Sequence, residues 1–126
     1  MHAKNDMEFV EDHLHSARKF TQFWGSPSDF KHAGVHVYQS VLLALKVHAK
    51  SISLTPVNSD DLNAILDTIL EKDINFLRDR GLRESRLRSI SDWKNLSAYD
   101  CNPAPSKDNL LTAITIAETL SVAQRS

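Results

Sequence analysis

The stretch from Asp29 to Ile52 constrains the fold most, because its apolar residues lie on more than one side of a helix. Helical spacing puts seven of them on one stripe: Phe30, Ala33, Val37, Val41, Ala44, Leu45 and Ile52. A second set falls outside that stripe: Val35, Leu42, Leu43 and Val47. A helix that is apolar on several sides is buried among neighbours, so the pattern predicts a central helix. Gly34 lies on the stripe and predicts the close approach of another part of the chain.

The rest of the chain carries start and stop signals for three more helices. With the central helix at about 29–52, we expect the others at about 5–24, 59–80 and 106–124. Gly81 predicts a left-handed cap, with Leu77 and Leu82 placed for a Schellman motif. The segment 82–105 is less regular, although its apolar spacing also fits a short extra helix before the last one. The expected fold is an all-α antiparallel four-helix bundle in a single domain, 1–126.

The bulk composition is that of an ordinary globular domain. A length of 126 residues is about one domain, and a net charge of −1 excludes a strongly charged surface over the whole molecule. The sequence has no apolar run of membrane-spanning length, and its polar start lacks the apolar core of a signal peptide. The single cysteine, Cys101, cannot form an intramolecular disulfide and has no adjacent activating base. We therefore expect a cytoplasmic protein that does not enter a membrane.

An arginine cluster is the best candidate for a ligand contact. Between Arg78 and Arg88 five arginines stand against two carboxylates, a local balance of +3 (5 − 2). Guanidinium groups match the geometry of phosphate, and aromatic rings can stack on bases. The predicted ligand-binding residues are Arg83, Arg86, Arg88, Trp93 and Tyr99. The alternative is a solvated helix end whose positive charges favour the helix dipole.

The histidines suggest a second, metal-binding site. His32 and His36 are one turn apart, and Asp29 precedes His32 by three residues, so the three side chains can converge on a metal ion. However, Gly34 and Val35 stand where a zinc-protease motif carries its catalytic Glu, and this face of the helix is polar. The alternative is two solvated histidines. The sequence indicates no organic cofactor.

His48 and Asp73 interrupt the apolar stripes of the second and third expected helices. A buried carboxylate needs a partner, because leaving it unpaired costs several kcal/mol. The positions predict a hydrogen bond between the two side chains across packed helices, in a structural role. The alternative is that Asp73, near the end of its helix, turns into water.

The last part of the chain combines an arginine-rich turn, the run from Ser97 to Asp100, a short proline-containing loop and a last helix carrying Ala113 and Ala117. In this combination it resembles the end of bacterial HEPN-type proteins. Tyr38, ahead of an apolar run, is also similar to the second helix of that family. Ribonuclease members carry an arginine followed, after four to six residues, by a histidine, and no arginine here is so followed. The resemblance implies a noncatalytic module that binds a nucleotide, RNA or a protein partner.

Two other functions stay open from the sequence. One is a small metal-dependent enzyme that uses the aspartate and two histidines above, and the other is an interaction protein of the immunity or antitoxin kind. We also expect a homodimer through the central or the last helix, because the central helix has more apolar residues than one core face needs. The alternative is that the segment 82–105 covers the excess.

Overall fold

The computed structural model describes residues 6–22, 27–52, 61–94, 96 and 104–125, and all regular structure in these residues is helical. The elements are α1 (Asp6–Gln22), α2 (Pro27–Ser51), α3 (Leu62–Lys72), α4 (Phe76–Asp79), α5 (Glu84–Ser89), the 3₁₀ helix η1 (Ile90–Trp93) and α6 (Lys107–Arg125). The expected all-α class is confirmed. No helix in the described part of the chain is both long and apolar enough to cross a membrane.

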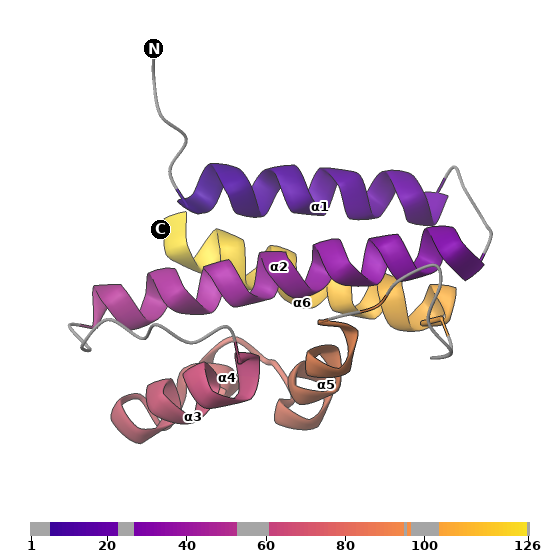
Figure 1. Cartoon of the computed structure of the whole chain (residues 1–126). Helices are drawn as coiled ribbons and strands as arrows, with labels where there is room; N and C mark the ends of the chain where they lie inside the picture. Colours follow the sequence, from indigo (N-terminus) through magenta and orange to yellow (C-terminus); the bar gives the residue numbers. More distant parts are fainter. Residues whose placement is uncertain (1–5, 23–26, 53–60, 95, 97–103, 126) are drawn as a thin grey trace, which may run out of the picture.

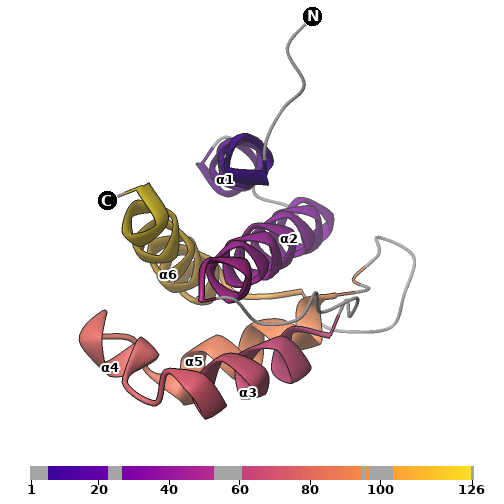
Figure 2. The same cartoon turned by 90° about the vertical axis from the view of Figure 1, so that its left-hand side faces the viewer.

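Three long helices form the upper part of the molecule and short helices cover its underside (Figure 1). α1 and α2 run antiparallel, and α6 runs in the same direction as α2. Viewed along the helices, α1, α2 and α6 occupy the corners of a triangle, with α3, α4 and α5 beneath α2 and α6 (Figure 2). The three long helices contact one another, α3 and η1 contact α2, and α5 contacts α6.

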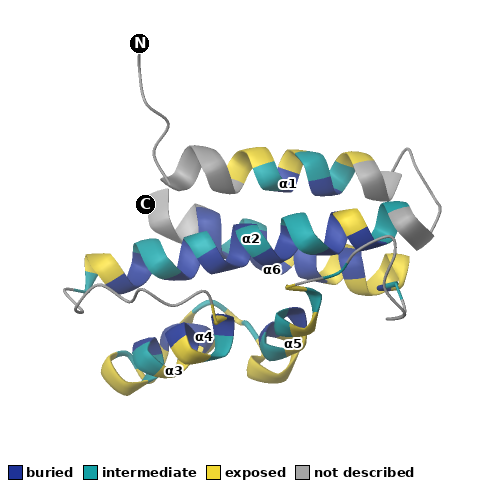
Figure 3. Ribbon diagram, in the orientation of Figure 1, coloured by how far each residue is buried: buried dark blue, intermediate teal, exposed yellow. Residues whose placement is uncertain are grey.

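The predicted central helix is confirmed. α2 has neighbours on several sides, and most of its length is buried or half-buried (Figure 3). Its fully buried apolar residues are Ala33, Val37, Tyr38, Val41, Leu42, Ala44, Leu45 and Ala49. Leu43, from the set outside the main stripe, is partly buried against this core. Leu42 and Leu43 of this set are therefore covered by other helices of the same chain, whereas Val35 and Val47 are half-buried.

The expected third helix, about 59–80, is not continuous, and the four-helix count is not confirmed. Residues 59 and 60 lie outside the described residues; α3 begins after Asp61, whose carboxylate accepts a hydrogen bond from the Asn63 N–H at 3.0 Å. It ends at Asp73, whose φ of −134° and ψ of 77° are not helical. Asp73 and Asn75 are poor helix formers because their side chains compete for backbone hydrogen bonds. The chain resumes as α4, α5 and η1, so the expected short extra helix is present.

The turn at Gly81 is the predicted Schellman motif. The Leu82 N–H donates to the Leu77 carbonyl at 2.9 Å, and the Gly81 N–H donates to the Arg78 carbonyl at 3.0 Å. Gly81 has a φ of +68°, which a residue with a Cβ adopts only at a cost. Leu77 is buried and Leu82 packs against the core. This turn ends α4 and directs the chain into α5.

Gly34 is the point where α2 approaches the segment before α6. A Cβ built on Gly34 would lie 3.0 Å from Leu96 Cδ1, 3.2 Å from Pro105 Cγ and 3.6 Å from Trp93 Cδ2. The predicted close approach is confirmed. The missing side chain allows η1 and the start of α6 to lie against α2.

We predict that Gly34→Val lowers the free energy of unfolding by about 1–3 kcal/mol, because added methyl groups must displace Leu96 and Pro105. Valine is a better helix former than glycine by a few tenths of a kcal/mol, so without crowding the change would be slightly stabilising. Urea denaturation measures the difference. Ala64→Val, on the exposed side of α3, is the control and should cost only about 0.5 kcal/mol. An unchanged or higher stability of Gly34→Val would contradict the close packing.

Candidate anion-binding groove between α5 and α6

Two adjoining hollows separate the α4–α5–η1 segment from α6. The first has a volume of about 240 Å³ and the second about 510 Å³. They share Arg86 on α5 and Thr112 and Ile116 on α6. We call the two hollows together the α5–α6 groove. Its remaining lining residues are Ser89, Ile90, Asp92, Trp93, Asn109 and Ala113 in the first hollow and Arg80, Gly81, Leu82, Arg83, Thr115 and Thr119 in the second.

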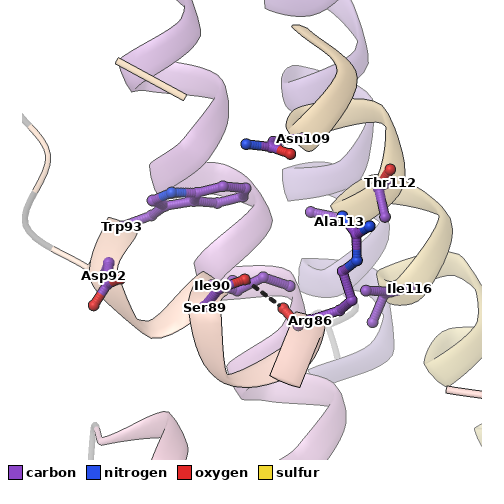
Figure 4. A pocket seen from close by; sticks show the side chains of 9 residues that line it. All are labelled: Arg86, Ser89, Ile90, Asp92, Trp93, Asn109, Thr112, Ala113 and Ile116. Atoms are coloured by element: carbon purple, nitrogen blue, oxygen red, sulfur yellow. Dashed lines mark hydrogen bonds between the residues drawn. The ribbon is translucent and has the colours of Figure 1, made fainter. Parts of the chain in front are cut away.

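Arg83 and Arg86 supply the exposed positive charge of the groove. Arg83 is the N-cap residue of α5 and Arg86 lies three residues further on, and both line the second hollow. Both are exposed, and neither pairs with a carboxylate among the described residues. Figure 4 shows the Arg86 side chain extending toward Thr112 and Ala113 of α6. Two of the predicted arginines thus line one groove.

Arg80 adds a third guanidinium group, which is held in place by contacts with Phe76. Its Nη1 donates to the Phe76 carbonyl at 2.9 Å, and its Cζ lies 4.2 Å from the centre of the Phe76 ring, a cation–π contact. The Arg80 Nε is buried and makes no hydrogen bond within the described residues. The charge therefore sits at the edge of the second hollow with part of its hydrogen-bonding capacity unused.

Arg88 does not belong to this groove, so the predicted patch of Arg83, Arg86 and Arg88 is divided. Arg88 Nη2 lies 2.5 Å from Asp67 Oδ1, and its Nε lies 3.3 Å from Glu84 Oε2. Its Nη1 also donates to Asn63 Oδ1 at 3.2 Å. The Asp67 and Glu84 carboxylates raise the pKa of Arg88 above its already high usual value, with the hydrogen bond to Asp67 as the largest cause. Arg88 joins α5 to α3.

Trp93 is the aromatic member of the groove. It is half-buried at the end of η1 and lines the first hollow, opposite Arg86 (Figure 4). Part of its ring packs near Gly34 of α2, which fixes the position of the indole. Tyr99, the other predicted aromatic residue, lies outside the described residues. One predicted ring thus reaches the groove.

Sequence reasoning missed Arg80 and three threonines of α6, Thr112, Thr115 and Thr119. The threonines recur at spacings of three and four, which places them on one helix face and was the available signal. The Thr115 and Thr119 hydroxyls donate to backbone carbonyls of their own helix, at 3.0 and 2.9 Å. These two hydroxyl protons are therefore already engaged, and the arginines are the strong donors toward a ligand.

The predicted metal ligands Asp29, His32 and His36 are not brought together. Among the described residues, no group of three His, Cys, Asp or Glu side chains could hold a metal ion. His36 instead faces His13 of α1, with the two Nδ1 atoms 3.0 Å apart. Burial lowers the pKa of His36, and the neighbouring His13 and His32 lower it further. Burial also lowers the pKa of His13, against the opposing charge of Asp12.

His48 and Asp73 approach each other as their positions indicated, but the predicted hydrogen bond is not formed, because the buried His48 Nε2 makes no hydrogen bond within the described residues. The His48 Nε2 lies 3.4 Å from the Asp73 Oδ2, which is longer than an ordinary hydrogen bond but within ion-pair distance. The His48 ring stacks on Phe76 with centroids 4.3 Å apart, and Phe76 carries Arg80 on its ring. Burial, and then the positive charge of Arg80, lower the pKa of His48, although Asp73 acts in the opposite direction. The contact holds α3 and α4 against the end of α2.

No protein-family model matches the chain, and no curated protein or solved structure matches it either. Function is therefore inferred from the residues and geometry of the groove.

We predict that acid destabilises the protein partly through His48. Its folded pKa is below the unfolded value of about 6.5, so the unfolded chain binds more protons as the pH falls through that value. The free energy of unfolding should therefore decrease between about pH 7.5 and pH 5.5. In His48→Gln this decrease should be smaller, as measured by urea denaturation across that range. His15→Gln, on the exposed side of α1, is the control. The same pH dependence in parent and His48→Gln would rule out this contribution.

Proposed function

We propose that this chain is a noncatalytic helical binding module that takes a phosphate-bearing ligand, a nucleotide or a segment of RNA, in the α5–α6 groove. The observation that carries the proposal is that Arg80, Arg83 and Arg86 line one groove with Trp93 at its end. Guanidinium groups bind phosphate oxygens through paired, charge-assisted hydrogen bonds. An aromatic ring next to them offers a stacking surface for a base.

The charge balance of the groove supports an anion as its ligand. Its lining residues include three arginines and a single carboxylate, Asp92, a balance of +2 (3 − 1). The chain as a whole has a net charge of −1, so this positive field is local. An anion beside Arg80 would also offset part of the cost of its half-buried charge. The two hollows therefore favour phosphate over a neutral ligand.

The lining residues also support binding rather than catalysis. The described residues that line the two hollows include no histidine, cysteine or lysine, and Asp92 is the one carboxylate. General acid–base or nucleophilic catalysis uses such groups in combination, with a base positioned by a third residue. This composition fits a noncatalytic member of the HEPN-type proteins, the family that the end of the sequence resembles. The relationship to that family remains a proposal, as does the cytoplasmic location.

We predict that RNA and nucleotides bind the parent protein and that Arg83→Glu/Arg86→Glu weakens binding by about tenfold or more, since about 1.4 kcal/mol corresponds to tenfold. Affinity should fall with salt, with a logarithmic slope of about −0.7 per phosphate contacted in a single strand. Fluorescence anisotropy of a labelled RNA at low and moderate salt measures both quantities. The double variant should have the shallower salt slope.

Two control variants separate the groove from general charge. Lys72→Glu/Arg78→Glu changes the net charge equally at exposed positions outside both hollows, and it should bind better than the groove variant. Arg88→Gln leaves the lining of the groove intact, so it should weaken binding less than the groove variant does, while losing about 0.5–1 kcal/mol of stability with its ion pairs. Equal affinity in the two charge-matched double variants would contradict a site in the groove. A parent that binds no RNA or nucleotide at low salt would favour a protein partner instead.

We predict that a bound base changes the fluorescence of Trp93. The chain has two tryptophans, so Trp24→Phe leaves Trp93 as the only one. Stacking of a base on the indole should quench its emission in step with the binding measured by anisotropy. Inorganic phosphate, which cannot stack, is the control and should bind without comparable quenching. Full binding of RNA with unchanged emission would place the base elsewhere than on Trp93.

Of the two helices expected to form a homodimer interface, the central helix α2 is the weaker candidate. Most apolar residues of α2 are buried against α1, α3, α6 and η1, so they do not require a second chain. On α6, Leu111 is 41% exposed and lies outside both hollows of the groove. The dimer is therefore proposed through α6, and sedimentation at tens of micromolar protein tests it. A monomer at that concentration would exclude it.

A further inference from the structure

The contact between His13 and His36 brings two metal-binding atoms together from different helices. The Nδ1 atoms are 3.0 Å apart, and the rings are tilted by 37° with centroids 5.3 Å apart. His13 lies on α1 and His36 on α2, which are antiparallel neighbours (Figure 1). Both side chains are half-buried, so the surrounding helices restrict their orientation. The two Nδ1 atoms are therefore within hydrogen-bond distance of each other.

The distance between the two nitrogens is that of two ligands on one small metal ion. A histidine nitrogen binds zinc at about 2.0–2.1 Å. Two such nitrogens are about 2.9 Å apart when they subtend a right angle at the ion and about 3.3 Å apart in a tetrahedral arrangement. The observed 3.0 Å lies between these values. The centroid distance of 5.3 Å shows that the two rings meet nearly head-on, so both side chains must turn before their Nδ1 lone pairs can point at one ion.

We propose that His13 and His36 form a two-histidine site for a divalent transition-metal ion, Zn²⁺ or Cu²⁺, which joins α1 to α2 and keeps water as its remaining ligands. Imidazole nitrogen suits both ions. In the metal-free pair one ring donates its Nδ1 proton to the Nδ1 lone pair of the other. In the metal-bound pair both Nδ1 lone pairs bind the ion, and the displaced proton moves through water to Nε2 of its own ring. No redox change and no further co-reactant are needed.

This site differs from the one expected from sequence. Asp29, His32 and His36 all lie on α2, and the described residues contain no group of three such side chains that could hold an ion. The proposed pair instead takes its second ligand from α1. A bridge between two helices stabilises their packing, because the ion binds the folded arrangement and not the unfolded chain. The proposal is independent of the α5–α6 groove, whose lining includes neither histidine.

The test uses the 126-residue chain without an affinity tag and with two background changes. Cys101→Ser removes the thiol and His2→Gln removes a histidine outside the described residues, both of which could bind the probe ions on their own. Isothermal titration calorimetry with Zn²⁺ gives the stoichiometry and affinity. Electron paramagnetic resonance of Cu²⁺ shows nitrogen coupling from the bound imidazoles. Thermal unfolding with and without Zn²⁺ measures the stabilisation.

We predict one ion per chain, a higher melting temperature with Zn²⁺ and coupling to two nitrogens with Cu²⁺. His13→Gln and His36→Gln should each lower the affinity by about tenfold or more, equivalent to about 1.4 kcal/mol, and abolish the thermal shift. The matched controls are His15→Gln on α1 and His32→Gln on α2, which should bind as the parent does. Circular dichroism checks that each variant is folded, and His13→Asn replaces His13→Gln if that variant is not.

Three outcomes would overturn the proposal. The first is no binding by the parent at millimolar Zn²⁺. The second is parent-like binding by His13→Gln, which would remove α1 from the site. The third is loss of binding in His32→Gln with His13→Gln unaffected, which would place the ion on α2 alone.

Discussion

Burial of α2 on several sides is the constraint on which the other elements depend. α1, α3, α6 and η1 all contact this helix, and its buried residues include the large side chains of Tyr38 and Leu45. Burying side chains of this size contributes about 1.5–3 kcal/mol each, which makes the position of every neighbour dependent on α2. Gly34 adds a local requirement, because only a residue without a side chain lets Leu96 and Pro105 approach so closely. The α5–α6 groove follows from this packing, since α2 positions both η1 and α6.

Polar contacts in the first half of α2 and near its C-terminal end favour particular positions of the neighbouring helices. His36 meets His13 of α1, and His48 meets Asp73 between α3 and α4. Half-buried polar groups cost free energy unless they are paired, so each contact favours one alignment of its two helices over a shifted one. Apolar stripes alone tolerate such shifts, because many aliphatic contacts are nearly equivalent. The histidines therefore add specificity to a core whose stability comes mainly from apolar burial.

The sequence predicts those structural features that depend on a few residues close together in the chain. The helix ends at Gly81 and Ser106 and the close approach at Gly34 each follow from a short pattern and are present. His48 and Asp73 also come together, but without the predicted hydrogen bond. The break after α3 was missed, although Asp73 and Asn75 are poor helix formers, because the apolar spacing continues through Phe76 and Leu77. The partner of His36 was missed because His13 becomes its neighbour only through the alignment of α1 on α2.

The short helix α5 separates Arg88 from Arg83 and Arg86. In an irregular segment, Arg83, Arg86 and Arg88 were expected to form one patch. Because α5 is helical, Arg88 instead lies on a different side of it from Arg86. Arg88 consequently neutralises Asp67 and Glu84 and ties α5 to α3, while Arg83 and Arg86 stay beside α6. The ion pairs hold α5 in the rotation that presents the other two arginines to the groove. A structural arginine thus sets the orientation of the candidate binding residues, and the fold keeps a positive groove on a chain of nearly zero net charge.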